Sequence, residues 1–146
     1  MNATNVLDEK SPSVQTHLGI IQGVISRMAT NSTSCKTWCI TVVSAILVII
    51  ADKGKPEFAW IAFIPALLFG SLDVYYLSLE KGFRKSYNSF IEKLHTGTLN
   101  VNDLFSVSPT GCGCSLAFSA ITSFSVWGFY IPLLALIFLA RKIVIG

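Results

Sequence analysis

An apolar run and a charged run follow one another in FAWIAFIPALLFGSLDVYYLSLEKGFRKSY, residues 58–87. Residues 58–79 contain no Lys, Arg or Glu. At a rise of about 1.5 Å per residue, this segment would form a helix about 33 Å long, enough to cross a hydrocarbon layer of about 30 Å. We expect the helix to continue into water over residues 80–95 as an amphipathic stalk and to stop at Thr96-Gly97.

The composition is that of an integral membrane protein. Of 146 residues, 52% are apolar and 13% are charged, against roughly 25% charged in soluble domains, and the mean hydropathy is +0.61. The length allows one small domain. The net charge of +3 is spread too thinly for a nucleic-acid surface. No secretory signal is visible, so we expect insertion through the protein's own spans, with a cytoplasmic N-terminus.

Residues 12–34 are predicted to form a cytoplasmic helix before the first span. Ser11-Pro12 is a helix-start signal, an N-cap hydroxyl followed by proline in the first turn. Apolar residues then recur every four or three positions and form one seam, close to the spacing of a coiled coil. The seam consists of Val14, Leu18, Ile21, Ile25 and Met28. It can pack on the subunit's own helices or contact a neighbouring subunit.

The first span is predicted over residues 37–51, after a bend at residues 31–34 where the chain meets the membrane. Its apolar core is only about 22 Å long, so crossing requires help at the interface. We expect Lys36 to extend its ammonium toward water and Trp38 to lie at the interface. A polar turn at residues 52–57 then makes the first two spans an antiparallel hairpin.

Residues 96–114 are predicted to form a cytoplasmic loop, in which residues 99–107 form a short extended segment lying on another part of the protein. The third apolar run, residues 115–140, is long enough to span with tilt. Pro132 could instead break it into a re-entrant hairpin, but a full span is the better prediction. The expected fold is therefore an all-α integral membrane protein: an amphipathic helix, a hairpin extended by a stalk, and a third C-terminal span.

The distribution of Lys and Arg favours the cytoplasmic N-terminus. Three spans place seven of these residues inside and four outside. The inside set is Lys10, Arg27, Lys36, Lys81, Arg84, Lys85 and Lys93, and the outside set is Lys53, Lys55, Arg141 and Lys142. The outward position of Arg141 and Lys142 counts against this orientation.

No catalytic arrangement is visible, and we expect neither an enzyme nor a cofactor. His17 and His95 are each predicted on an exposed face, and the sequence shows no Ser/His/Asp set and no phosphate-binding glycine loop. The four cysteines are Cys35, Cys39, Cys112 and Cys114. Their spacing differs from that of four-cysteine zinc sites, and the cytoplasm disfavours disulfides, so we expect free thiols and no bound metal.

Hydroxyl side chains are the candidates for lining a water path. They occur on one face of the first span or at the start of the third, although small hydroxyl residues also pack helices together in lipid. The candidates are Thr37, Thr41 and Ser44, or alternatively Ser119, Thr122 and Ser123.

Asp73 is an acid near the inner boundary of the second span, and an ionisable group there is a functional hypothesis by default. The other interpretation is an interfacial acid, either hydrogen-bonded to Tyr76 or paired with a lysine of a neighbouring helix. Glu80 and Arg84 form an i,i+4 pair just beyond it. The candidate gate residues are Asp73, Tyr76, Glu80, Arg84 and Tyr87.

One segment resembles the signature of the SLATT family: Leu72-Asp73-Val74-Tyr75-Tyr76-Leu77, then Glu80, then Phe83-Arg84-Lys85-Ser86-Tyr87. The upstream runs Ile25-Ser26-Arg27-Met28-Ala29 and Ser34-Cys35-Lys36-Thr37-Trp38 are similar to the lead-in of that family. The resemblance covers about residues 14–107. SLATT proteins are small bacterial membrane effectors built on a two-span hairpin and associated with nucleotidyltransferase-type and other conflict systems. The third apolar run goes beyond that pattern.

The resemblance implies a pore-forming effector of antiphage defence in the bacterial inner membrane. Three spans cannot easily enclose a water path, so a channel requires a homo-oligomeric ring, such as a tetramer. The implied partners are the lipid bilayer and a nucleotide or oligonucleotide signal made by a partner nucleotidyltransferase, or direct contact with that enzyme. The alternative is a non-conducting membrane anchor that recruits a cytoplasmic partner to the stalk and residues 97–114. A third hypothesis, a holin-like lysis protein, is less well supported, because holins do not need so long a cytoplasmic segment.

Overall fold

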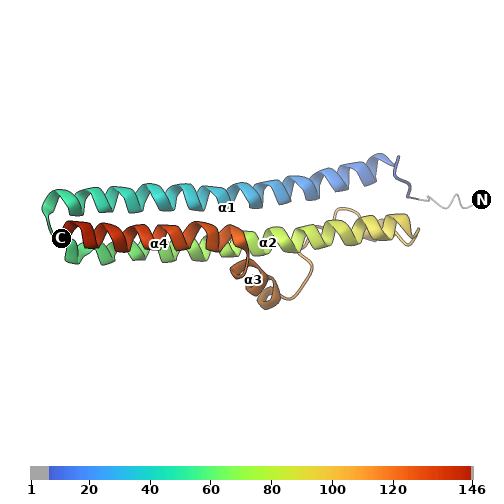
Figure 1. Ribbon diagram of the computed structural model, residues 1–146. Coiled ribbons are helices and arrows are strands. Elements are labelled where there is room, and N and C mark those ends of the chain that lie inside the picture. The colour runs from blue at the N-terminus through green and yellow to red at the C-terminus, as the bar shows by residue number, and fades with distance from the viewer. Residues whose placement is uncertain (1–6, 146) are drawn as a thin grey trace, which may run out of the picture.

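The computed structural model describes residues 7–145, and over that range the chain is all helical, as predicted. Its elements are α1 (Pro12–Lys53), the 3-10 helix η1 (Pro56–Ala62), α2 (Phe63–His95), the 3-10 helix η2 (Val101–Asp103), α3 (Gly113–Ile121) and α4 (Phe124–Ile145). Figure 1 shows α1 and α2 as a long antiparallel hairpin, with α4 along the half nearest the turn and α3 projecting at the side. Within residues 7–145, three helices are long and apolar enough to cross a membrane: Pro12–Lys53, Glu57–His95 and Phe124–Ile143.

The hairpin turn forms where the sequence predicts it. Gly54 ends α1 in the left-handed conformation, with φ of 59°, and its N–H donates to the carbonyl of Ala51. The second span then begins with η1 before α2 starts at Phe63. Pro65 lies in the first turn of α2, where a missing backbone N–H costs no helical hydrogen bond. The proline therefore does not interrupt α2, which runs on to His95.

The predicted bend at residues 31–34 is wrong, because α1 continues through it without interruption. Thr30 and Thr33 donate their hydroxyl hydrogens to the carbonyls four residues earlier, so these side chains remain inside the helical pattern instead of ending it. Ser32 turns inward and is buried. The N-terminal helix and the first span are therefore one rod of 42 residues.

The third apolar run is broken, but not at Pro132, which lies inside α4. The break is at Thr122 and Ser123, between α3 and α4, so the prediction of one helix over residues 115–140 is wrong. Thr122 donates its hydroxyl to the carbonyl of Phe118, and Lys81 of α2 donates to the carbonyl of Ser119. Lys81 thus satisfies a carbonyl that a continuous helix would have paired with the N–H four residues later.

The end of α4 lies at the hairpin turn. The guanidinium of Arg141 stands 4.8 Å from the ring centre of Trp60 in η1, and α4 packs against η1 and α2. Helix α4 starts beside the middle of α2 and ends at the turn (Figure 1). It therefore lies along the apolar half of the hairpin, which holds the two predicted spans over residues 37–51 and 58–79. Of the third run, residues 124–143 alone are long and apolar enough to cross a membrane, and a full crossing stays a prediction.

The core joins α1, α2, α3 and α4 through small and branched apolar residues. Its buried members are Cys39, Val43, Ala62, Ala66, Leu77, Ala120, Val126, Tyr130, Leu133 and Ile137. The alanines let the helices approach closely, which is how helices pack in lipid. Large apolar side chains cover the outside of the same half, including Val48 at 69% exposed and Leu67 at 67%. That distribution suits a hydrocarbon surrounding.

The loop after α2 differs from the predicted extended segment. Helix α2 ends at His95, one residue before the predicted stop, and Gly97 adopts a left-handed φ of 67°. A capping box between Asn100 and Asp103 then forms η2, because each side chain bonds the backbone of the other. Val101 points into solvent at 64% exposed. Local hydrogen bonds therefore override the apolar alternation.

Candidate functional site

Asp73 of α2 is completely buried and carries the most unusual polar contact in the described chain. The Lys36 ammonium of α1 lies 2.7 Å from its Oδ2 and 2.8 Å from its Oδ1. The hydroxyl of Ser32, one turn earlier on α1, also donates to Oδ1. Of the interpretations open from sequence, pairing with a lysine of a neighbouring helix is the one found, and Tyr76 is not a partner.

Lys36 does not extend toward water, contrary to the prediction. Its side chain is only 17% exposed because the carboxylate of Asp73 faces it across the hairpin. Two opposite charges taken out of water together are stable only when their geometry is close and their remaining hydrogen bonds are made. Here Lys36 also donates to the Ser32 hydroxyl at 3.2 Å, so the three side chains form one network between α1 and α2.

The network is enclosed by apolar and weakly polar groups. Cys35 and Cys39 are buried on the same side of α1. Tyr130 of α4 is buried as well and belongs with Cys39 to one core cluster, and its hydroxyl has no hydrogen-bond partner among the described residues. The network therefore lies where all three long helices meet. A shift of α1 against α2 would have to break or rebuild the ion pair.

The first set of predicted pore residues forms an exposed stripe on α1. Thr37, Thr41 and Ser44 are all exposed. Thr37 and Thr41 donate to the carbonyls four residues earlier, at 3.1 and 2.8 Å. With their donors satisfied by the helix itself, these hydroxyls tolerate lipid and still present oxygen lone pairs to a cation or water. Through Thr33 and Thr30, the stripe continues away from the turn toward the polar end of the hairpin, which consists of residues 12–34 of α1 and 80–95 of α2.

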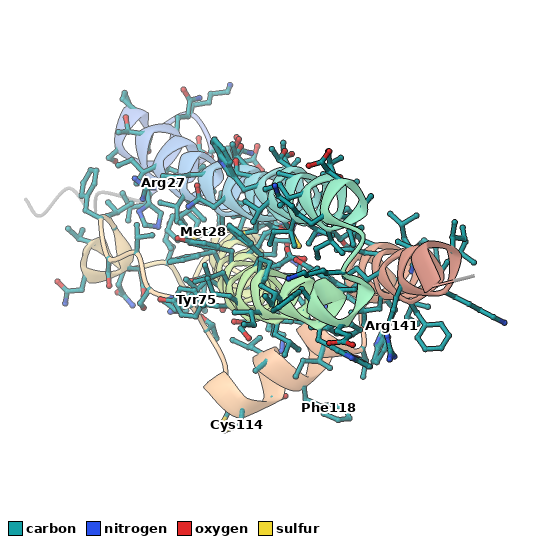
Figure 2. All side chains as sticks on the ribbon, turned by 90° about the vertical axis from the view of Figure 1, so that its left-hand side faces the viewer. Arg27, Met28, Tyr75, Cys114, Phe118 and Arg141 are labelled. Carbon is teal, nitrogen blue, oxygen red and sulfur yellow. The ribbon has the colours of Figure 1, made fainter. Side chains whose placement is uncertain are left out.

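The second set lies elsewhere and does not join that stripe. Ser119 receives Lys81 on its hydroxyl at 3.0 Å, Thr122 bonds back to Phe118, and Ser123 lies in the break between helices. Figure 1 places α3 and α1 on opposite sides of α2, and Figure 2 shows Phe118 of α3 projecting away from the long helices. The two predicted sets cannot line the same path within one subunit.

The predicted gate residues do not form a single site. Glu80 and Arg84 make the expected i,i+4 ion pair at 2.8 Å, but Arg84 is 61% exposed on the surface of α2. Tyr87 accepts a hydrogen bond from Gln22 of α1 at 3.2 Å and so links the two helices beyond the spans. Asp73 faces α1, whereas Arg84 faces solvent. Only Asp73 belongs to the buried network.

The predicted oligomer seam is partly buried within the subunit itself. Val14 is 0% and Ile21 is 2% exposed, so these two residues are packed inside the single chain. The other three members, Leu18, Ile25 and Met28, are half-buried. The burial of Val14 and Ile21 follows the interpretation in which the seam packs on its own subunit. Contacts between copies stay a prediction.

His17 is the functional candidate that the sequence prediction placed wrongly. It was expected on an exposed face but is 1% exposed, and its Nδ1 accepts a hydrogen bond from the N–H of Phe105 at 2.9 Å. The signal was present, because His17 follows Val14 by three residues and precedes Ile21 by four. The helical spacing that places His17 on the buried face therefore predicts its burial better than its polarity does, because an imidazole can be neutral.

All four cysteines are free in the structure, with the pair in α1 buried and Cys112 and Cys114 exposed. Within residues 7–145 no three His, Cys, Asp or Glu side chains gather where a metal ion could bind. The chain is thus a small all-helical protein with three membrane-competent helices around a buried ion pair. Comparisons with protein-family models, curated proteins and solved structures find no match to it.

Proposed function

We propose that this protein is a homo-oligomeric ion channel of the bacterial inner membrane, acting as an antiphage effector that depolarises the cell and arrests its growth. The observation that carries the proposal is the exposed hydroxyl stripe on α1, which includes Thr37, Thr41 and Ser44. The helix satisfies the donors of Thr37 and Thr41, but lipid offers no donor to the oxygen lone pairs of the stripe, so water or a cation is the better neighbour for them. A ring of subunits would turn the stripe toward a shared aqueous axis.

The hairpin offers a path from the polar end to that stripe. Helices α1 and α2 each run unbroken from the apolar half to the polar end. A ligand or partner that binds at the polar end can therefore shift the membrane-spanning part of both helices. The Lys36–Asp73 pair joins the two helices and favours one register of α1 against α2. A signal that stabilises the other register would open the ring. The SLATT resemblance suggests a nucleotide-derived signal.

The test is ion flux through purified protein in liposomes, combined with membrane-potential measurements in expressing cells. Thr41→Leu and Ser44→Leu should reduce the flux at least several-fold, because each replaces a hydroxyl on the proposed axis by an apolar side chain. Ser71→Leu is the matched control. Ser71 is also exposed and bonds the carbonyl four residues earlier, but it lies on α2, away from the stripe. Equal effects of all three variants would contradict the proposal.

The alternative is the non-conducting anchor, with the polar end and residues 97–114 as the docking surface. Expression separates the two functions. A channel should be toxic and collapse the membrane potential, whereas an anchor without its partner should leave growth unchanged. A protein that stays monomeric in mild detergent and conducts no ions would favour the anchor.

A further inference from the structure

A cavity of about 210 Å³ lies at the polar end of the hairpin, between α1, α2 and the loop that follows α2. Three contacts close the loop over it. The Ser86 hydroxyl donates to the carbonyl of Ser108 at 2.9 Å, and the N–H of Thr110 donates to the carbonyl of Gly82 at 3.1 Å. The third contact is the Lys93–Asp103 ion pair at 2.8 Å. These contacts hold the loop as one wall of the cavity, which remains open to solvent on another side.

His17 presents an unused donor to this cavity. Its Nδ1 accepts the Phe105 N–H, so the neutral ring carries its proton on Nε2. No acceptor among the described residues receives that proton, although the side chain is 1% exposed and lines the cavity. The Nε2–H is therefore available to water or to a ligand that enters the cavity. Phe105 itself is held at φ of 61°, a conformation that side-chain-bearing residues rarely adopt.

Among the other lining groups, Lys93 can only donate, whereas the hydroxyls can donate or accept. Lys93 has three N–H bonds, of which Asp103 occupies one. Asp103 is the one acid in the lining, and both of its oxygens are engaged, Oδ1 by Lys93 and Oδ2 by the N–H of Asn100 at 3.0 Å. Ser89 and Ser106 add hydroxyls without a partner among the described residues. The free N–H groups of His17 and Lys93 therefore favour a ligand that carries acceptor oxygens.

We propose that this cavity binds a small soluble oxyanion, a phosphate group or a molecule that carries one, between His17 Nε2, Lys93 and the serine hydroxyls. Lysine, an imidazole N–H and hydroxyls together supply the charge-assisted bonds that phosphate oxygens accept. A closed cavity of about 150 Å³ holds benzene, so the space of about 210 Å³ here accommodates a phosphate group. Lys93 lies roughly 20 Å along the helix beyond Leu79, too far for a lipid headgroup.

The site can be tested without assuming conduction, because the two histidines report separately. We would label histidine with ¹⁵N and ¹³C in nanodiscs of neutral lipid and titrate inorganic phosphate against chloride at equal ionic strength. Saturable shifts of the His17 ring resonances are expected. His95 is the internal control, since its side chain is 64% exposed and does not line the cavity. Equal, non-saturating shifts of both histidines would overturn the proposal.

Variants locate the ligand. Lys93→Gln should weaken phosphate binding by about tenfold or more, as expected for the loss of a charge-assisted bond. Lys85→Gln is the matched control, because Lys85 is exposed on the same helix and outside the lining. Lys93→Gln also removes the ion pair to Asp103, so Ser89→Ala provides a second variant that breaks no contact between described residues and should weaken binding by a smaller factor. Unchanged affinity in both Lys93→Gln and Ser89→Ala would refute the site, and so would saturation that appears only with anionic lipid.

Discussion

Removing one partner of the Lys36–Asp73 pair leaves a charge buried among apolar side chains. We expect Asp73→Asn and Lys36→Met each to lower the free energy of unfolding by about 3–5 kcal/mol, the usual cost of breaking a buried pair. The charge left behind has lost its partner within 3 Å and has little access to water. Denaturant unfolding in detergent, followed by near-ultraviolet circular dichroism, would measure the change.

The double variant separates a pair effect from two independent losses. Lys36→Met with Asp73→Leu removes both charges and fills the space, so it should recover most of the lost stability. The exposed pair of Lys93 and Asp103 is the control, and Lys93→Met should cost less than about 1 kcal/mol. Strictly additive losses at Lys36 and Asp73 would mean that the two residues do not stabilise the fold as a pair.

Gly82 is the position on α2 where a methyl group has no room. A Cβ there would stand 2.8 Å from the Cβ of Pro109 and 3.1 Å from the Cδ1 of Leu116. We expect Gly82→Ala to loosen the loop and α3, lowering the free energy of unfolding by about 1–3 kcal/mol as overpacking does. Gly23→Ala is the control, with nothing within 4 Å, and helix propensity should make it stabilising by up to about 1 kcal/mol. Equal, favourable effects of both would contradict the close packing at Gly82.

Single residues show how far the sequence could predict the site. Asp73 can be identified from the sequence as a candidate functional residue, because an acid within an apolar run is unusual whichever face of the helix it lies on. Its partner Lys36 was not, because it lies 37 positions away and the pairing depends on how the hairpin turn sets α1 against α2. Gly82 carried no signal either, since its neighbours come from the loop and α3. Long-range register is the information that local patterns lack.

At the scale of elements, the helices were predicted better than their boundaries. The Gly54 turn, the end of α2 and the helix start at Pro12 follow from local residues, and the structure confirms them. Continuity through residues 31–34 was missed because serine and threonine are ambiguous. Their hydroxyls can end a helix or bond back into it, and the burial of Ser32 beside Asp73 decides for the second.

The loop over the polar end should loosen as the pH falls. Burial lowers the pKa of the His17 imidazole, while Asp103 acts in the opposite direction with a smaller effect. A depressed histidine pKa means that the folded loop favours the neutral ring. Its stabilisation is therefore present above about pH 6.5 and decreases below that value, by at most about tenfold in the opening equilibrium per pH unit. Protonation would fall on Nδ1 and remove the acceptor for Phe105.

Amide hydrogen exchange measures this loosening. The protection factor of the Phe105 N–H, corrected for the intrinsic rate, should drop between pH 7.5 and 5.5. His17→Asn keeps an acceptor at the position of Nδ1 but cannot titrate, so its protection should be independent of pH in that window. Asp103, which faces His17 beside Lys93, does not add a transition of its own there. A hydrogen bond from Lys93 and one from the Asn100 N–H hold the pKa of the Asp103 carboxyl below its ordinary value. An unchanged wild-type protection factor would exclude His17 as the cause.

At the scale of the whole molecule, the number of apolar segments was predictable and the division of the third was not. No glycine or proline lies between Ser115 and Ile121 or at the break itself, so the sequence read as one run. At the break, Lys81 reaches from α2 to the carbonyl of Ser119, a contact between distant residues that no local pattern predicts. A cation from another helix thus lies at the end of α3, and α4 then starts in a new direction beside the hairpin.

The long axis of the molecule predicts which residues face opposite sides of the membrane. Lys55 lies in the turn between α1 and η1, whereas Cys112 and Cys114 lie at the start of α3, which projects beside the middle of α2 (Figure 1). With the N-terminus inside, a membrane-impermeant maleimide added to intact spheroplasts should modify Lys55→Cys and spare the two native thiols. Permeabilisation should then expose Cys112 and Cys114, which are accessible in the fold, but not the buried Cys35 and Cys39.

The result also tests the charge asymmetry from which the orientation was inferred. Seven Lys and Arg on one side against four on the other is a modest bias, and Arg141 adds to the minority side by lying against Trp60 at the turn. Labelling of the native thiols alone in intact cells would invert the orientation and place the oxyanion cavity outside the cell. Labelling of Lys55→Cys and the native thiols from the same side would mean that the hairpin does not cross the membrane, and the channel proposal would fail with it.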